Sequence, residues 1–280
     1  MLARTFDVSG LNAALLRLQA LGYGSHIRTL NYHDVPESHA GGFEAQLRFF
    51  AERFVPVGYD DLLAFQAGQW EHRRPGLILS FDDGVRSHAE VAAPLLEKYG
   101  FTGWFFVPVG FIDTPFEQQR EYAEEHSISS GATRPGRPPA MSWEEIRALD
   151  RRHVVGCHTL HHTRLRATLT AQELEREIVV SKDRLERELG HPVALFAWVG
   201  GEEWAYSSAA ARVIRRAGFR VGFMTNSAVI RSGTDPLQLQ RTNVEVDYPP
   251  SLMRFQLSGF MDLLYTPKRR RVNRLTAATS

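Results

Sequence analysis

The stretch Leu-Ile-Leu-Ser-Phe-Asp-Asp-Gly at positions 77–84 decides the fold class of this chain. Its apolar first half predicts a buried strand, and two adjacent carboxylates, Asp82 and Asp83, follow at the strand's end. In parallel α/β folds, polar residues collect at the C-terminal ends of strands, where these folds place their sites. Two neighbouring carboxylates repel each other. A cleft can hold both if a metal ion neutralises one and the other is kept for proton transfer. The alternative is a plain turn, because Asp-Gly is a common turn pair.

A second short apolar run, residues 154–157, ends in the sequence His-Thr-Leu-His-His at positions 158–162. His158 and His162 are four positions apart, so they would share one face if the chain turned helical there. One carboxylate and two imidazoles would make an open Zn²⁺ site with room for water and substrate. The alternative is a pair of hydrogen-bonded loop histidines. Cys157 precedes them, and we favour a buried thiol there over a thiolate ligand.

Together the two stretches resemble a known family. Ser-Phe-Asp-Asp-Gly at 80–84 resembles the Thr-Phe-Asp-Asp-Gly motif of the polysaccharide deacetylase (NodB-homology, carbohydrate esterase 4) family, and residues 158–162 match its His-Ser/Thr-x-x-His motif. Their separation of about 75 residues is also typical of that family. The resemblance runs from about Leu30 to about Val246 and implies a distorted (β/α) barrel with fewer than eight full units.

The resemblance also implies roles for individual residues. Asp83, His158 and His162 would bind the metal, and Asp82 would be the general base. His161 is the variable position of its motif and is not expected to be a ligand. A third motif is altered, because Phe-Ala-Trp-Val-Gly-Gly at 196–201 stands where one branch of the family has Phe-Ala-Tyr-Pro-Tyr-Gly. Trp198 is therefore expected either to form an apolar wall for the sugar or to lie in the core.

The general acid has no obvious counterpart in this sequence. Many family members carry a late Leu-x-x-His motif, but no histidine follows His191 here. His33, at the end of the first predicted strand, is our substitute, with a histidine hydrogen-bonded inside the barrel as the alternative. Arg241 also follows a predicted strand. It is expected to orient Asp82 or bind substrate oxygens, unless it is a structural arginine.

Composition favours a single domain over residues 1–280, because 280 residues with 43% hydrophobic content suit one large α/β domain. A net charge of +1 gives no global electrostatic argument for a nucleic-acid partner. The N-terminus lacks an apolar signal core of about 7–15 residues, and no run of about 18 apolar residues occurs. We therefore expect a cytoplasmic protein.

Strands and helices alternate about seven times in the predicted order, which indicates a parallel β/α architecture. Residues 113–140 interrupt it with a Ser-, Gly-, Pro- and Arg-rich stretch, which we interpret as a substrate-facing inserted loop, with a flexible insertion as the alternative. The end, residues 265–280, contains a basic cluster at 268–271 and Arg274. We expect a frayed, solvated tail, with weak attachment to anionic lipid as the alternative. Strands are expected at residues 26–32, 55–57, 77–81, 102–107, 153–156, 193–199, 220–224 and 237–240.

The sequence thus predicts a metal-dependent N-deacetylase acting on an N-acetylated sugar of a polysaccharide or glycan precursor. A deformylase or deacylase of a lipid-linked aminosugar and a non-catalytic glycan-binding relative are the alternatives. Zn²⁺ is the expected metal, although Co²⁺, Ni²⁺ or Fe²⁺ would suit the same ligands. The partner expected is the carbohydrate, with weak attachment of the basic tail to a membrane surface as the alternative.

Overall fold

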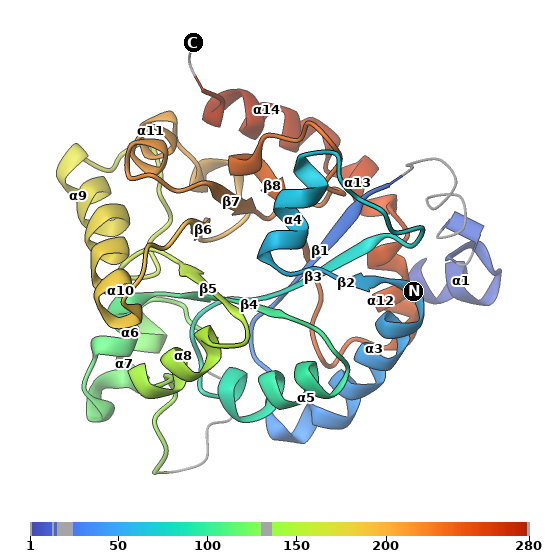
Figure 1. Ribbon diagram of the computed structural model, residues 1–280, viewed down its shortest axis with the longest axis horizontal. Coiled ribbons are helices and arrows are strands. Elements are labelled where there is room, and N and C mark those ends of the chain that lie inside the picture. The colour runs from blue at the N-terminus through green and yellow to red at the C-terminus, as the bar shows by residue number, and fades with distance from the viewer. Residues whose placement is uncertain (1, 13, 16–24, 130–135, 279–280) are drawn as a thin grey trace.

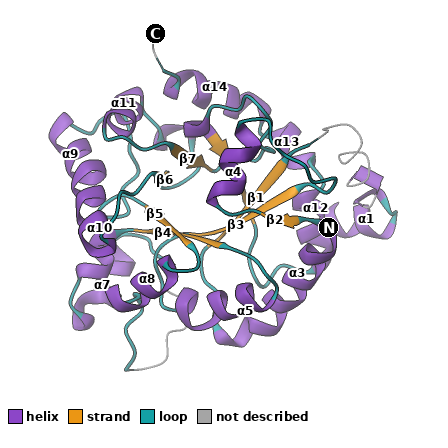
Figure 2. Ribbon diagram, viewed as in Figure 1, coloured by secondary structure: helices purple, strands orange, loops and turns teal. Residues whose placement is uncertain are grey.

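The computed structural model describes residues 2–12, 14–15, 25–129 and 136–278. Its centre is one parallel sheet with the strand order β8-β7-β6-β5-β4-β3-β1-β9, and β2 pairs with β3 beside this path. Figure 2 shows these strands inside a surround of helices. The strands are β1 Ile27–Tyr32, β2 Val55–Pro56, β3 Gly76–Phe81, β4 Gly103–Val107, β5 Val154–Cys157, β6 Leu195–Ala197, β7 Val221–Met224, β8 Leu239–Gln240 and β9 Thr242–Asn243.

The sheet closes on itself through one short segment near the C-terminus. β8 pairs with β7, β9 pairs with β1, and a single residue, Arg241, separates β8 from β9. One continuous stretch therefore joins the two edges, which gives the distorted barrel that the family resemblance implies. The distortion is visible in the pairing, because β1 and β3 share six residue pairs but β5 and β6 share only one, Cys157 with Phe196.

Helices surround this barrel (Figure 1). Two of them, α8 and α9, begin at capping boxes in which Ser142 pairs with Glu145 and Thr170 with Glu173, so both starts follow from the sequence. The helices are α1 Leu2–Val8, α3 Ala40–Arg53, α4 Tyr59–Gln66, α5 Ala93–Lys98, α6 Val109–Asp113, α7 Gln119–Glu125, α8 Trp143–Asp150, α9 Ala171–Glu175, α10 Ser181–Leu189, α11 Ser208–Arg216, α12 Pro250–Leu257, α13 Phe260–Leu264 and α14 Thr266–Thr276.

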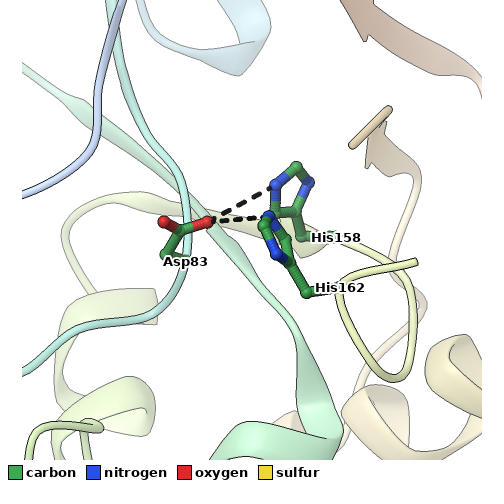
Figure 3. Close-up of side chains that lie close together, drawn as sticks. All are labelled: Asp83, His158 and His162. Atoms are coloured by element: carbon green, nitrogen blue, oxygen red, sulfur yellow. Dashed lines mark ion pairs between the residues drawn. The ribbon is translucent and has the colours of Figure 1, made fainter. Parts of the chain in front are cut away.

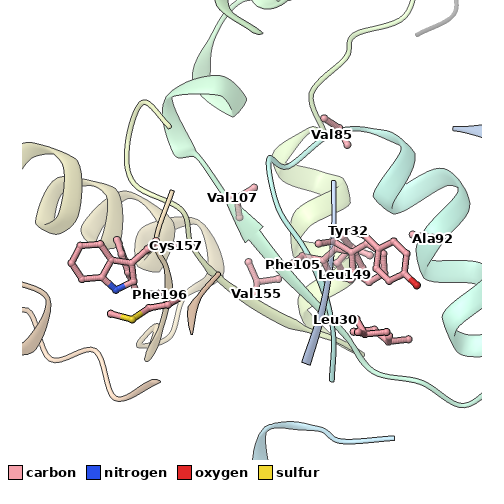
Figure 4. Packing of buried hydrophobic residues seen from close by; sticks show 14 of the residues in the cluster. Leu30, Tyr32, Val85, Ala92, Phe105, Val107, Leu149, Val155, Cys157 and Phe196 are labelled. Carbon is pink, nitrogen blue, oxygen red and sulfur yellow. The ribbon is translucent and has the colours of Figure 1, made fainter. Parts of the chain in front are cut away.

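Alternate residues of the strands fill two hydrophobic clusters. On β4, Trp104 and Phe106 belong to one cluster with Phe65 of α4, whereas Phe105 and Val107 belong to the other. The second cluster packs between strands and helices, where Phe105 lies near Leu149 of α8 (Figure 4). Fully burying an aromatic side chain of this kind contributes about 1.5–3 kcal/mol. This packing fixes the strands whose ends carry the polar residues.

The structure corrects two expectations for the chain outside the strands. The inserted segment 113–140 is not simply a loop, because a 3₁₀ turn, Phe116–Gln118, and helix α7 lie within it; its residues 130–135 are outside the described residues. The basic end is not frayed, because most of it forms helix α14, which packs against α11. No helix in the described part of the chain is long and apolar enough to cross a membrane.

Candidate metal centre and cleft

The two adjacent acids leave β3 through a tight backbone turn. Asp83 has a φ of 77°, in the left-handed region that residues other than glycine seldom adopt, and Gly84 follows with a φ of 67°. A Cβ at Gly84 would lie 2.6 Å from Cγ1 of Val107, so glycine is also required sterically. This strained turn separates the two carboxylates, so that each meets a different environment.

Asp83 faces two histidines from the end of β5. Its Oδ1 lies 3.1 Å from Nε2 of His162 and 3.8 Å from Nε2 of His158 (Figure 3). The ligand atoms of these three residues all lie within 4.8 Å of one another. Oδ1 of Asp83 is buried and forms no hydrogen bond of good geometry. A buried carboxylate oxygen beside two imidazole nitrogens fits a divalent metal ion, which would satisfy all three atoms.

Backbone carbonyls fix the orientation of both imidazole rings. Nδ1 of His158 donates to the carbonyl of Ala197 at 2.9 Å, and Nδ1 of His162 donates to the carbonyl of His126 at 2.7 Å. With a proton on Nδ1, a neutral imidazole offers the lone pair of Nε2 to a metal. Burial lowers the pKa of His158 to about 4, which keeps this ring neutral.

The segment that carries these histidines is not helical. Thr159 and His162 both have positive φ values, 63° and 52°, and these two bends bring the rings to the same side. The expectation of a shared helical face is therefore corrected. The buried carboxylate of Glu177 holds the segment, accepting hydrogen bonds from the backbone N–H groups of Leu160 and His161 at 3.1 and 2.9 Å.

His161 points away from the metal centre. Its Nδ1 lies 2.7 Å from Oε1 of Glu177, so its ring is engaged by the same carboxylate that holds the backbone. Cys157 is also outside the cluster, because it is fully buried, and burial raises the pKa of its thiol to about 12. Neither residue belongs to the group of potential ligands among the described residues.

Asp82 is bound most closely by a buried arginine, and its Oδ2 also lies 3.8 Å from Nε2 of His158. Arg241 donates from Nη1 to Oδ1 at 2.6 Å and from Nη2 to Oδ2 at 2.8 Å, and Nδ2 of Asn31 adds a third hydrogen bond at 3.0 Å. Burial opposes the ionisation of Asp82, but the guanidinium of Arg241 outweighs it and lowers the carboxyl pKa. Arg241 itself is fully buried and is not among the residues that line the cleft, so it contacts Asp82 and not the open space.

His33 lies on the wall of the same cleft, at the end of β1. Its Nδ1 is 2.8 Å from Oε1 of Glu245, a residue that follows β9. Burial opposes protonation of this ring, but Glu245, with Asp82 and Asp83 nearby, raises the pKa of His33 to about 9. Sequence reasoning missed Glu245, although an acid shortly after the last strand was a usable signal.

Trp198 occupies a different position from the expected sugar-facing wall. Its ring is only 2% exposed and packs against Phe196 and Tyr206 in the core. It follows β6, belongs to the larger hydrophobic cluster and does not line the cleft. The structure thus supports the core alternative for this residue.

The cleft above the metal centre has a volume of about 550 Å³. Several of its walls come from segments that the motifs do not cover. Ser127 and Ser129 line it from the inserted segment, and the backbone N–H of Ser129 lies 3.4 Å from Oδ2 of Asp83. Tyr265 and Lys268 line it from the C-terminal end. The insertion and the basic end therefore both contribute to the candidate site.

Comparison with known proteins agrees with this architecture. The sequence profile of the family described as polysaccharide deacetylase matches residues 71–222, more than half of the chain. The chain has no match among curated proteins.

Three solved structures resemble this chain in fold, and two of them are named as a deacetylase or a de-N-acetylase. The Streptococcus pyogenes deacetylase PplD in complex with acetate is 19% identical, with a TM-score of 0.65 over 83% of this chain and 98% of its own. The de-N-acetylase from Aggregatibacter actinomycetemcomitans is 14% identical, with a TM-score of 0.66 over 83% and 100%. IcaB from Ammonifex degensii is 21% identical, with a TM-score of 0.64 over 85% and 98%. At these identities the likeness establishes the fold.

Proposed function

This chain is a member of the polysaccharide deacetylase (NodB-homology, carbohydrate esterase 4) family, and we propose that it is a metal-dependent hydrolase that removes N-acetyl groups from a sugar. Its substrate would be a polysaccharide or a glycan precursor. The observation that carries the proposal is that the two neighbouring carboxylates, Asp82 and Asp83, have different partners. His158 lies 3.8 Å from both acids, but His162 lies 3.1 Å from Asp83 alone and Arg241 forms its ion pair with Asp82 alone.

Asp83, His158 and His162 would hold the metal ion. A divalent cation in this position would polarise the acyl carbonyl and acidify a water molecule. Zn²⁺ suits one carboxylate and two imidazoles, and Co²⁺, Ni²⁺ or Fe²⁺ would accept the same ligands. The fixed Nδ1 hydrogen bonds of both histidines support this assignment, because they direct Nε2 toward Asp83.

Asp82 is the proposed general base. Hydrolysis of an amide requires a group that removes a proton from the attacking water. Arg241 keeps Asp82 ionised at neutral pH, so a proton acceptor is available beside the metal centre. Arg241 acts here as a positioning residue for Asp82. Of the two roles expected from the sequence, orienting Asp82 or binding substrate oxygens, we therefore propose the first.

His33 is the proposed general acid. The departing amine needs a proton, and a donor must be protonated at the pH of the reaction. The pKa of about 9 produced by Glu245 keeps His33 protonated at neutral pH, and its ring lies on the cleft wall.

Acyl release tests the proposal directly. Purified protein loaded with Zn²⁺ should release acetate from N-acetylated oligosaccharides, and Asp82→Asn should not. Formate release from N-formylated sugars, without acetate release, would favour the deformylase alternative instead. Metal binding without release of either acid would favour a glycan-binding relative.

A further inference from the structure

The charged residues of the cleft are paired almost completely. Apart from Asp82 and Asp83, the described residues that line the cleft include two carboxylates, Glu202 and Glu245. Glu202 lies 3.3 Å from the guanidinium of Arg164, and Glu245 lies 2.8 Å from the ring of His33. Each carboxylate of the cleft therefore already has a cationic partner, or a metal-binding role.

Lys268 is the exception among the cations that line the cleft. It projects from α14, and its Nζ donates to the carbonyl of Gly201 at 2.7 Å and lies 4.5 Å from the ring centre of Tyr265. Within the described residues no carboxylate lies within 4.0 Å of it. An ammonium group has three N–H donors, so two remain beyond the one that Gly201 accepts.

The neighbours of Lys268 on the same helix show that its position is specific. Arg269 donates to the backbone carbonyls of Asn226 and Ser227, and Arg271 pairs with Glu203 at 2.8 Å. Arg270 is exposed and does not line the cleft. Of this basic cluster, only Lys268 brings its charge to the cleft that contains Asp83 and the two histidines.

The charge of Lys268 is only partly compensated within the protein. Burial lowers the pKa of Lys268 more than the carboxylates of Glu202 and Glu203 raise it, so a net cost of keeping this ammonium charged away from water remains. An anion bound beside it would offset that cost and would use its free donors. A charge-assisted hydrogen bond from an ammonium to a carboxylate or phosphate oxygen is about twice as strong as a neutral one.

We propose that Lys268 binds an anionic substituent of the substrate, so that the sugar accepted in this cleft carries a carboxylate or a phosphate. This inference rests on the proposed function, because it names the substrate class of the same site. Neutral N-acetylated sugars would bind as well, but they would leave Lys268 without an anionic partner.

Equilibrium binding to the Zn²⁺-loaded protein tests this inference with three probes: N-acetylglucosamine, N-acetylglucosamine 6-phosphate and N-acetylmuramic acid. We expect at least one of the two acidic sugars to bind about 10-fold more tightly than the neutral one, as a charged hydrogen bond predicts. Comparing the affinity for N-acetylglucosamine 6-phosphate with that for N-acetylmuramic acid shows whether a phosphate or a carboxylate is preferred. Lys268→Gln should abolish the preference, Lys268→Arg should retain much of it, and Arg270→Gln, the matched control, should leave it unchanged.

The possible results test anion binding by Lys268 and the proposed deacetylase function separately. Equal binding of all three sugars, no binding of any, or a preference that survives Lys268→Gln in a folded protein would overturn the inference. Acetate release measured in parallel tests the function. Tighter binding of an acidic sugar without acetate release would overturn the deacetylase proposal and leave the role of Lys268 intact. Acetate release without tighter binding of an acidic sugar would overturn the role of Lys268 and leave the deacetylase proposal intact.

Discussion

Arg241, the one residue between β8 and β9, donates two hydrogen bonds to Asp82. The position that closes the barrel therefore also supplies the cation that keeps the proposed base ionised. Fold and chemistry are coupled at this point, because a change in the closing segment would move the guanidinium.

Replacing Arg241 with Met should impair both stability and activity. Removing one partner of a buried ion pair typically costs about 3–5 kcal/mol in the free energy of unfolding. Without the guanidinium, burial raises the pKa of Asp82, so the acidic limb of the pH–rate profile should move to higher pH. Urea unfolding and kcat/KM against pH measure the two effects. An unchanged acidic limb would show that Arg241 does not control Asp82.

Asp82→Asn should separate catalysis from metal binding. Asparagine keeps the shape of the side chain but cannot accept a proton from water, so acyl release should fall by about 10²–10⁴-fold or more. The metal content should remain that of the wild type, because Asp82 lies outside the triad. Near-normal rates in this variant would remove Asp82 from the role of base.

Glu245→Gln should change the alkaline limb of the pH–rate profile. In the wild type, activity that needs protonated His33 should be lost as the pH rises through about 9. Without the Glu245 carboxylate, burial dominates, and this loss should occur at lower pH, nearer the ordinary histidine pKa of about 6.5. His33→Ala should lower the rate by about 10²–10⁴-fold. A profile unaffected by both substitutions would exclude His33 as the acid.

Glu177→Ala, which removes the acceptor oxygens, should weaken metal binding without changing Asp83, His158 or His162. Glu177 holds the backbone at Leu160 and His161, between the proposed ligands His158 and His162. Loss of such a supporting contact typically reduces metal affinity by about 10–100-fold. Glu175→Ala is the matched control, because Glu175 forms an exposed ion pair with Arg216 instead. Equal metal affinity in both variants would contradict a positioning role for Glu177.

Local sequence patterns predicted most of the elements that place the site. The apolar runs before Asp82 and His158 became β3 and β5, and the strand-end histidines and Asp83 do come together. These features are local, so periodicity and residue type were enough to indicate them. The closing strands β8 and β9 were harder to predict, because each has only two residues and they pair with different partners.

Features that depend on tertiary packing could not be predicted in the same way. Periodicity does not distinguish a strand-end Trp that faces the cleft from one such as Trp198 that belongs to the larger hydrophobic cluster. The basic end was misinterpreted as a tail because its charges suggested solvation. Its Arg269 donates instead to backbone carbonyls distant in sequence, and no local pattern encodes such acceptors. The contacts of Glu177 and Glu245 are of the same kind.

Metal content per chain tests the central claim most directly. Protein purified after incubation with Zn²⁺ or Co²⁺ should contain about one divalent ion per chain, because Asp83, His158 and His162 form the one such cluster among the described residues. The folded double variant His158→Ala/His162→Ala should contain none, and its acyl release should disappear with the ion. A wild-type chain that binds no divalent metal at neutral pH, or a double variant that binds it as well as the wild type, would contradict a metal-dependent hydrolase at this site.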